Sequence, residues 1–175
     1  MSSNLPTRIL GVLGIHAALG GVYWAIIKFG FANQNALAPD LIDRLDGDPA
    51  HVAAYVDDMS KQALLAGFGG LLVAAVLACI WLVLIDRSPP YGDKSARAKR
   101  GSWAGLMIVA VLVSIAWFWI KMIGAPIAVL LAPSVPLNAS GIAFVLLVLG
   151  YWLSTALFAP ASTKVAVPGG SLFGG

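Results

Sequence analysis

Charged residues are scarce in this sequence, and glutamate does not occur at all. Only 11% of the 175 residues are charged, and all eight acids are aspartate. A soluble domain carries about 25% charged residues, so a chain with 59% hydrophobic residues would expose too much apolar surface to water. The composition therefore predicts that the solvent of this protein is lipid, and the length fits one membrane domain.

Cysteine and histidine are nearly absent, and no catalytic motif is present. The single cysteine, Cys79, excludes an intramolecular disulfide and a thiol-rich metal site, and it is expected to be a small buried hydrophobe. The only histidines are His16 and His51. The sequence contains no nucleophile elbow, no HExxH, no phosphate-binding glycine loop and no C-x-x-C pair. We therefore expect neither an enzyme nor a metal site.

What the sequence does contain is four long apolar runs. They cover residues 9–31, 63–85, 103–125 and 140–158. About 20 helical residues cross a hydrocarbon core of about 30 Å, so each run is long enough to span a bilayer. The first run is too long for a signal peptide, and we take it as a retained helix. The chain is thus predicted to be an all-α bundle of two transmembrane hairpins.

The basic residues predict the orientation of these hairpins. The segment 86–102 between the second and third runs holds five of the eleven Lys and Arg residues: Arg87, Lys94, Arg97, Lys99 and Arg100. Arg8 and Lys164 flank the same side, whereas the long polar segment 32–61 is acidic. Because cytoplasmic loops carry an excess of Lys and Arg, we expect a basic cytoplasmic loop at 86–102, an outer polar loop at 32–61, and both termini in the cytoplasm.

Small residues recur at spacings of three and four in the first two runs. At about 100° per residue they fall on one face of each helix. These residues are Gly11, Gly14, Ala18, Gly21 and Ala25 in the first run, and Ala63, Gly67, Gly70, Ala74 and Ala78 in the second. Such faces let helices approach closely in lipid. We expect the two faces to pack against each other, with a dimer or subunit interface as the alternative.

His16 and Tyr23 lie one heptad apart, roughly opposite the small residues of the first run. A histidine at membrane depth is costly and usually finds a partner. We favour a neutral imidazole hydrogen-bonded to a carbonyl or hydroxyl within the fold. If the glycine face points into the bundle, His16 faces outward, and the alternatives are a haem, a chlorophyll-type pigment or another subunit. A bis-histidine haem is not expected, because His51 lies in a polar loop.

Three further segments carry expectations. Asp48-Pro49 predicts a helix start, and residues 49–61 are expected to form an amphipathic lead-in that lies on the membrane surface or against a partner.

Lys121, near Trp117, is expected to reach outward to the interface. The alternative is that Lys121 pairs with an acid of the first loop, or with an anionic lipid or ligand. Residues 127–139 are expected to form a loop, and the glycine-rich tail 160–175 is of a kind that is normally disordered.

The function that this pattern favours is a non-catalytic accessory or assembly subunit of a larger complex in a bacterial inner membrane, with respiratory and photosynthetic complexes among the candidates. Its expected partners are other integral membrane subunits and lipids, and no nucleic acid, because the net charge of +3 is explained by topology. One alternative is a small transporter or channel, whose polar path would use Ser114, Lys121, Tyr151 and Ser154. The other alternative is a pigment- or haem-binding protein acting through His16.

Overall fold

A computed structural model of the chain describes residues 4–32, 49–123 and 134–173. It contains four long helices and two short 3-10 helices, with no strand in these ranges. They are α1 (Leu5–Ala32), α4 (Pro49–Arg87), α5 (Asp93–Ile123), α7 (Ser134–Phe158), η1 (Ala161–Ala166) and η2 (Gly170–Phe173). Each long helix contains a stretch that is apolar and long enough to cross a membrane. The predicted all-α membrane bundle is confirmed, and the chain is a multi-pass membrane protein.

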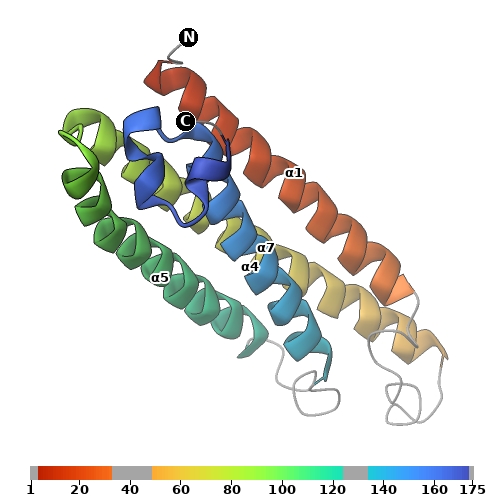
Figure 1. Ribbon diagram of the computed structural model, residues 1–175. Coiled ribbons are helices and arrows are strands. Elements are labelled where there is room, and N and C mark those ends of the chain that lie inside the picture. The colour runs from red at the N-terminus through yellow and green to blue at the C-terminus, as the bar shows by residue number, and fades with distance from the viewer. Residues whose placement is uncertain (1–3, 33–48, 124–133, 174–175) are drawn as a thin grey trace.

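The basic segments gather at one end of the bundle. Figure 1 shows the start of α1, the turn between α4 and α5, and the C-terminal segment together at this end, which we call the hinge end. Arg8 of α1 and Asp86 of α4 form an ion pair there, with 3.5 Å between Nη1 and Oδ1. At the opposite end, which we call the Lys121 end, α1 and α5 finish and α4 and α7 begin. The grouping matches the predicted topology; the compartment that each end faces stays a prediction.

The helices begin at residues with local start signals, whereas the predicted loop boundaries differ from the observed ones. Asn4 caps α1, since its Oδ1 accepts a hydrogen bond of 3.2 Å from the Thr7 backbone N–H. Helix α4 begins at Pro49, as predicted, but continues unbroken to Arg87, so the amphipathic lead-in is not a separate surface helix. The predicted basic loop is also shorter than expected, because α5 begins at Asp93. Gly92, with φ +83°, adopts the left-handed conformation that glycine tolerates best and so allows this tight turn.

The last crossing begins earlier than predicted, because Pro136 was expected to lie in a loop. Helix α7 begins at Ser134, two turns earlier than the predicted start at residue 140. Pro136 lies in its first turn, where the missing N–H has no intrahelical partner to lose. Residues 127–133 of the expected loop lie outside the described residues.

The C-terminal tail is folded and packed, contrary to its composition. Ala166 and Val167 are buried in the hydrophobic cluster of the hinge end. Trp152 Nε1 donates to the Pro168 carbonyl at 2.7 Å, and Arg100 Nη2 donates to the Val165 carbonyl at 3.1 Å. These contacts tie the tail to α7 and α5, so tertiary packing overrides a glycine-rich sequence.

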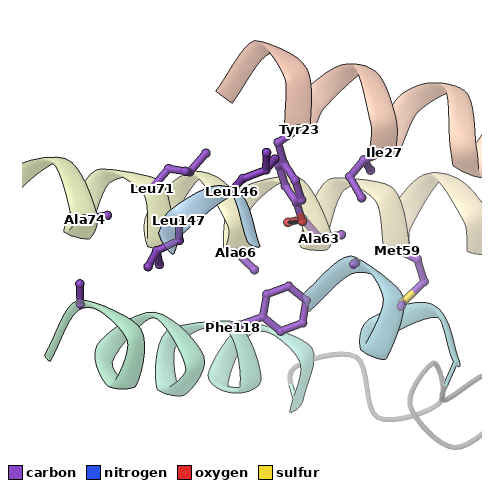
Figure 2. Packing of buried hydrophobic residues seen from close by; sticks show 12 residues of the cluster. Tyr23, Ile27, Met59, Ala63, Ala66, Leu71, Ala74, Phe118, Leu146 and Leu147 are labelled. Carbon is purple, nitrogen blue, oxygen red and sulfur yellow. Dashed lines mark hydrogen bonds between the residues drawn. The ribbon is translucent and has the colours of Figure 1, made fainter. Parts of the chain in front are cut away.

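The core near the Lys121 end is built around Tyr23. Figure 2 shows Tyr23 and Ile27 of α1 pointing toward α4, with Phe118 of α5 on the other side. The Tyr23 hydroxyl donates to the Ala63 carbonyl at 2.9 Å. The Tyr23 ring lies directly over Gly67, where an added Cβ would be 2.1 Å from the ring. A large side chain thus fills the space that a glycine leaves.

The expected packing of small residues against small residues is therefore wrong for α1. Gly14, Ala18 and Gly21 are exposed, and a Cβ added at Gly14 or Gly21 would meet no atom within 4 Å. Gly11 lies at the edge of this face against the Phe158 ring of α7. The Tyr23 hydroxyl gives a reason for the rotation of α1, because unsatisfied polar atoms are costly in lipid. Burying the side that carries Tyr23 gives this hydroxyl the Ala63 carbonyl of α4 as an acceptor, whereas His16 Nδ1 bonds within α1 to the Val12 carbonyl.

The small residues of α4 do lie inside the bundle, but their neighbours are large. Gly67, Gly70 and Ala74 are all buried. Gly67 receives Tyr23, and Gly70 lies against Ser114 of α5 and Leu147 of α7. Each glycine thus admits a side chain from a neighbouring helix instead of another helix backbone.

Candidate functional site

His16 points into the bundle and not toward the outside. Its Nδ1 lies 2.9 Å from the Val12 carbonyl, so Nδ1 carries the proton and Nε2 carries a lone pair. The carbonyl hydrogen bond is the arrangement that the sequence favoured. Nε2 is buried with no hydrogen-bond partner among the described residues, and it would lie 3.1 Å from a Cβ added at Gly150 of α7.

This geometry bears on the pigment and haem alternatives. A metal held by His16 would have to reach the Nε2 lone pair, but that atom faces Gly150 and has almost no accessible surface. His16 also lines a groove between α1 and α4, although its Nε2 is buried. Among the described residues there is also no group of three or more His, Cys, Asp or Glu side chains placed to hold a metal ion.

The four residues of the alternative transport path fall into two separate places. Ser114 and Lys121 lie toward the Lys121 end of α5, whereas Tyr151 and Ser154 are buried in α7 near the hinge end. The Tyr151 hydroxyl donates to the Trp103 carbonyl at 3.1 Å, and Ser154 Oγ donates to the Tyr151 carbonyl at 3.2 Å. The two hydroxyls near the hinge end are therefore satisfied by backbone carbonyls.

Sequence reasoning missed a hydrogen-bonded group that joins α5 to α7. Trp103 Nε1 donates to Thr155 Oγ1 at 2.9 Å, and Thr155 Oγ1 in turn donates to the Tyr151 carbonyl at 2.7 Å. The Trp103 and Tyr151 rings also pack with their centroids 5.6 Å apart. Residue 103 lies about 50 positions from residues 151 and 155, so the sequence does not show that they meet. The only signal is that buried Trp and Tyr side chains usually need a hydrogen-bond partner.

Lys121 and its neighbours lie where the third crossing ends. Lys121 Nζ lies 4.7 Å from the centroid of the Trp117 ring, a cation–π contact. Trp117 in turn packs onto Gly69 of α4, where an added Cβ would be 2.2 Å from Nε1. Lys121 has no carboxylate within ion-pair distance among the described residues. The first polar segment held another predicted partner of Lys121; Asp57 and Asp58 of this segment lie in α4, where Asp57 pairs with Lys61, and residues 33–48 lie outside the described residues.

Two concave surfaces lie among the described residues. One is a shallow groove of about 510 Å³ between α1 and α4, beside the exposed small residues of α1, and it is lined by Ala17, Gly20, Gly21, Trp24, Phe68 and Leu72 among others. The other is a cavity of about 310 Å³ between α4, α5 and α7. Two more glycines without close neighbours, Gly101 and Gly105, lie on the exposed side of α5 near the hinge end.

Comparison of the chain with protein-family models, with curated proteins and with solved structures finds no significant match. We therefore infer the function from the surfaces described above.

Proposed function

We propose that this protein is a non-catalytic accessory or assembly subunit of a larger complex in a bacterial inner membrane, and that α1 is its docking helix. The observation that carries the proposal is the outward face of α1 formed by Gly14, Ala18 and Gly21, which we call the small-residue face. These residues are exposed, and Gly14 and Gly21 have empty space beside them.

The cost of glycine in a helix supports a partner for this face. Each glycine lowers helix stability by about 1 kcal/mol relative to alanine, so Gly14 and Gly21 together cost about 2 kcal/mol. Neither of them accommodates a side chain of the bundle, so the bundle gains nothing in return. A face of small residues lets a second transmembrane helix come into close backbone contact. Contact with lipid does not require small residues.

The surroundings of the small-residue face fit a helix as well. The groove between α1 and α4 runs along the same side of the molecule and continues the face toward Phe68 and Leu72 of α4. Leu10 and Phe29, both largely exposed, lie on α1 before and after the face. A partner helix would therefore meet apolar side chains around a strip of small residues.

The test is co-purification of the tagged full-length chain from its native membranes in mild detergent, with quantitative mass spectrometry. We expect one or more integral membrane proteins at fixed stoichiometry, reduced about tenfold or more by Gly14→Leu with Gly21→Leu. A Cβ added at either position meets no atom within 4 Å, so we expect both variants to keep the fold. The matched control is Gly105→Leu, an exposed glycine of α5 with no neighbour within 4 Å. Free monomer alone, or equal loss in the control, would overturn the proposal.

A further inference from the structure

We infer that the cavity between α4, α5 and α7 binds one acyl chain of an anionic phospholipid, whose headgroup lies at Lys121. This site is separate from the small-residue face and does not depend on the proposed function. The cavity lies in the half of the bundle toward the Lys121 end, between Val111–Trp119 of α5 and Leu137–Leu147 of α7, and α4 forms its floor.

The cavity lies away from the hydrogen bonds that join α5 to α7 at the hinge end. There Trp103, Tyr151 and Thr155 join the two helices by hydrogen bonds. Toward the Lys121 end, small residues keep the space between the helices open; these are Ala66, Gly67 and Gly70 on α4, and Gly141 and Ala143 on α7. Exposed side chains, Phe144 and Trp119 among them, stand at its rim, so the space opens sideways toward lipid.

The lining selects an apolar occupant. The two hydroxyls in the cavity wall are already satisfied, because Ser114 Oγ donates to the Gly70 carbonyl at 3.3 Å and Ser140 Oγ donates to the Leu137 carbonyl at 2.9 Å. The remaining lining side chains are aliphatic or aromatic apart from the indole N–H of Trp119. Water needs two to four polar partners in such a space, and an ion needs more. Hydrocarbon needs none.

The volume of the cavity fits part of a hydrocarbon chain. At about 310 Å³ the cavity is about twice the size of an apolar cavity that holds benzene. The cavity therefore admits part of one acyl chain.

The charge at the end of α5 favours an anionic headgroup. Lys121 lies two turns beyond Ser114 on nearly the same face of α5, which places it about 10 Å further along the helix axis. Its side chain does not line the cavity, since its Nζ lies over the Trp117 ring, so a headgroup would meet Lys121 outside the cavity. Trp117 and Trp119 accompany it, as aromatic side chains do at the membrane–water interface. A lysine there attracts a phosphate, and one basic residue near a membrane surface contributes about a fivefold preference for an anionic lipid.

The experiment uses the full-length protein in phosphatidylcholine vesicles that contain a trace of lipid with a diazirine on one acyl chain. The headgroup of this probe is either phosphatidylglycerol or phosphatidylcholine. After irradiation, labelled peptides are mapped by mass spectrometry. We expect labelling concentrated on residues 111–119 and 137–147, about fivefold stronger with the anionic probe. Labelling spread evenly over all lipid-facing helices would overturn the site, and equal labelling by both probes would overturn the headgroup assignment.

Three variants separate the parts of the inference. Gly141→Leu fills the cavity and should remove most labelling by both probes, whereas Gly21→Leu, on the other side of the bundle, should leave labelling unchanged. Lys121→Gln should reduce the anionic probe to the level of the zwitterionic one and leave the latter as it was. If Gly141→Leu does not fold by circular dichroism, Ala143→Leu replaces it, and Lys121→Gln still decides the headgroup. Unchanged labelling in a folded cavity-filling variant would overturn the inference.

Discussion

The rotation of α1 is tested most sharply by two alanine substitutions at glycines on different helices. Gly67→Ala of α4 places a Cβ 2.1 Å from the Tyr23 ring, whereas Gly21→Ala of α1 places one in open space. Tyr23 is fully buried and its hydroxyl bonds to the Ala63 carbonyl, so the ring cannot shift without loss. Under the sequence-based expectation, in which both glycines face each other, the two substitutions would be about equally harmful.

The difference between the two variants can be worked out from the structure. Both exchange glycine for alanine inside a helix, so the gain in helix propensity of up to about 1 kcal/mol cancels. Overpacking of a filled core costs about 1–3 kcal/mol, and a weakened membrane hydrogen bond about 0.6 kcal/mol more. Gly67→Ala should therefore be about 2–4 kcal/mol less stable than Gly21→Ala, which should equal or slightly exceed the native protein.

The assay is reversible unfolding by sodium dodecyl sulfate in mixed micelles, followed by circular dichroism. Tyr23→Ala should relieve the clash, so the double variant with Gly67→Ala should lose less stability than the sum of the single changes. The reasoning would be refuted if Gly21→Ala proved as destabilising as Gly67→Ala, or if the two changes at Tyr23 and Gly67 were additive.

The remaining predictions concern the hinge end and the topology. Thr155→Val removes the acceptor of Trp103 Nε1 and should destabilise the bundle by about 1–3 kcal/mol, whereas Ser162→Val, exposed on η1, should change little in the same unfolding assay. Asp86→Asn weakens the pair with Arg8; because the Asp86 side chain is 44% exposed, the change should cost about 1 kcal/mol or less. A loss that persisted in high salt would contradict a screened ion pair. In a Cys79→Ser background, Asp58→Cys and Ser95→Cys should react with membrane-impermeant maleimide from opposite sides, with Ser95→Cys protected in intact cells. Labelling of both from one side would rule out the four-span arrangement.

The spans themselves were predictable because hydropathy is a local property of the chain. All four apolar runs became helices, and Pro49 started one where the Asp48-Pro49 pair predicted it. The orientation of α1 was not predictable in the same way, because its two faces carried competing signals. The small residues favoured close helix packing, and His16 and Tyr23 favoured burial of the opposite side. In the structure the side with His16 and Tyr23 is buried, and the Tyr23 hydroxyl reaches the Ala63 carbonyl of α4.

The candidate sites were less accessible from sequence than the spans. Ser114 and Lys121 were recognised as neighbours on α5, but the cavity beside them depends on how α5 and α7 diverge, which no single run encodes. The bond from Trp103 to Thr155 joins residues 52 positions apart for the same reason. The folded tail depends on Trp152 and Arg100 finding backbone carbonyls, which its composition does not reveal.

The most direct test of the docking helix is a photo-crosslinking amino acid at Ala18, in the middle of the small-residue face, compared with one at Leu112 on the exposed side of α5. Irradiation is carried out in native membranes, and crosslinked peptides are sequenced by mass spectrometry. The docking of α1 on a partner predicts that Ala18 crosslinks to one transmembrane segment of another protein, that Leu112 does not, and that Gly14→Leu abolishes the product. Crosslinks from Ala18 to lipid alone, as at Leu112, would contradict it.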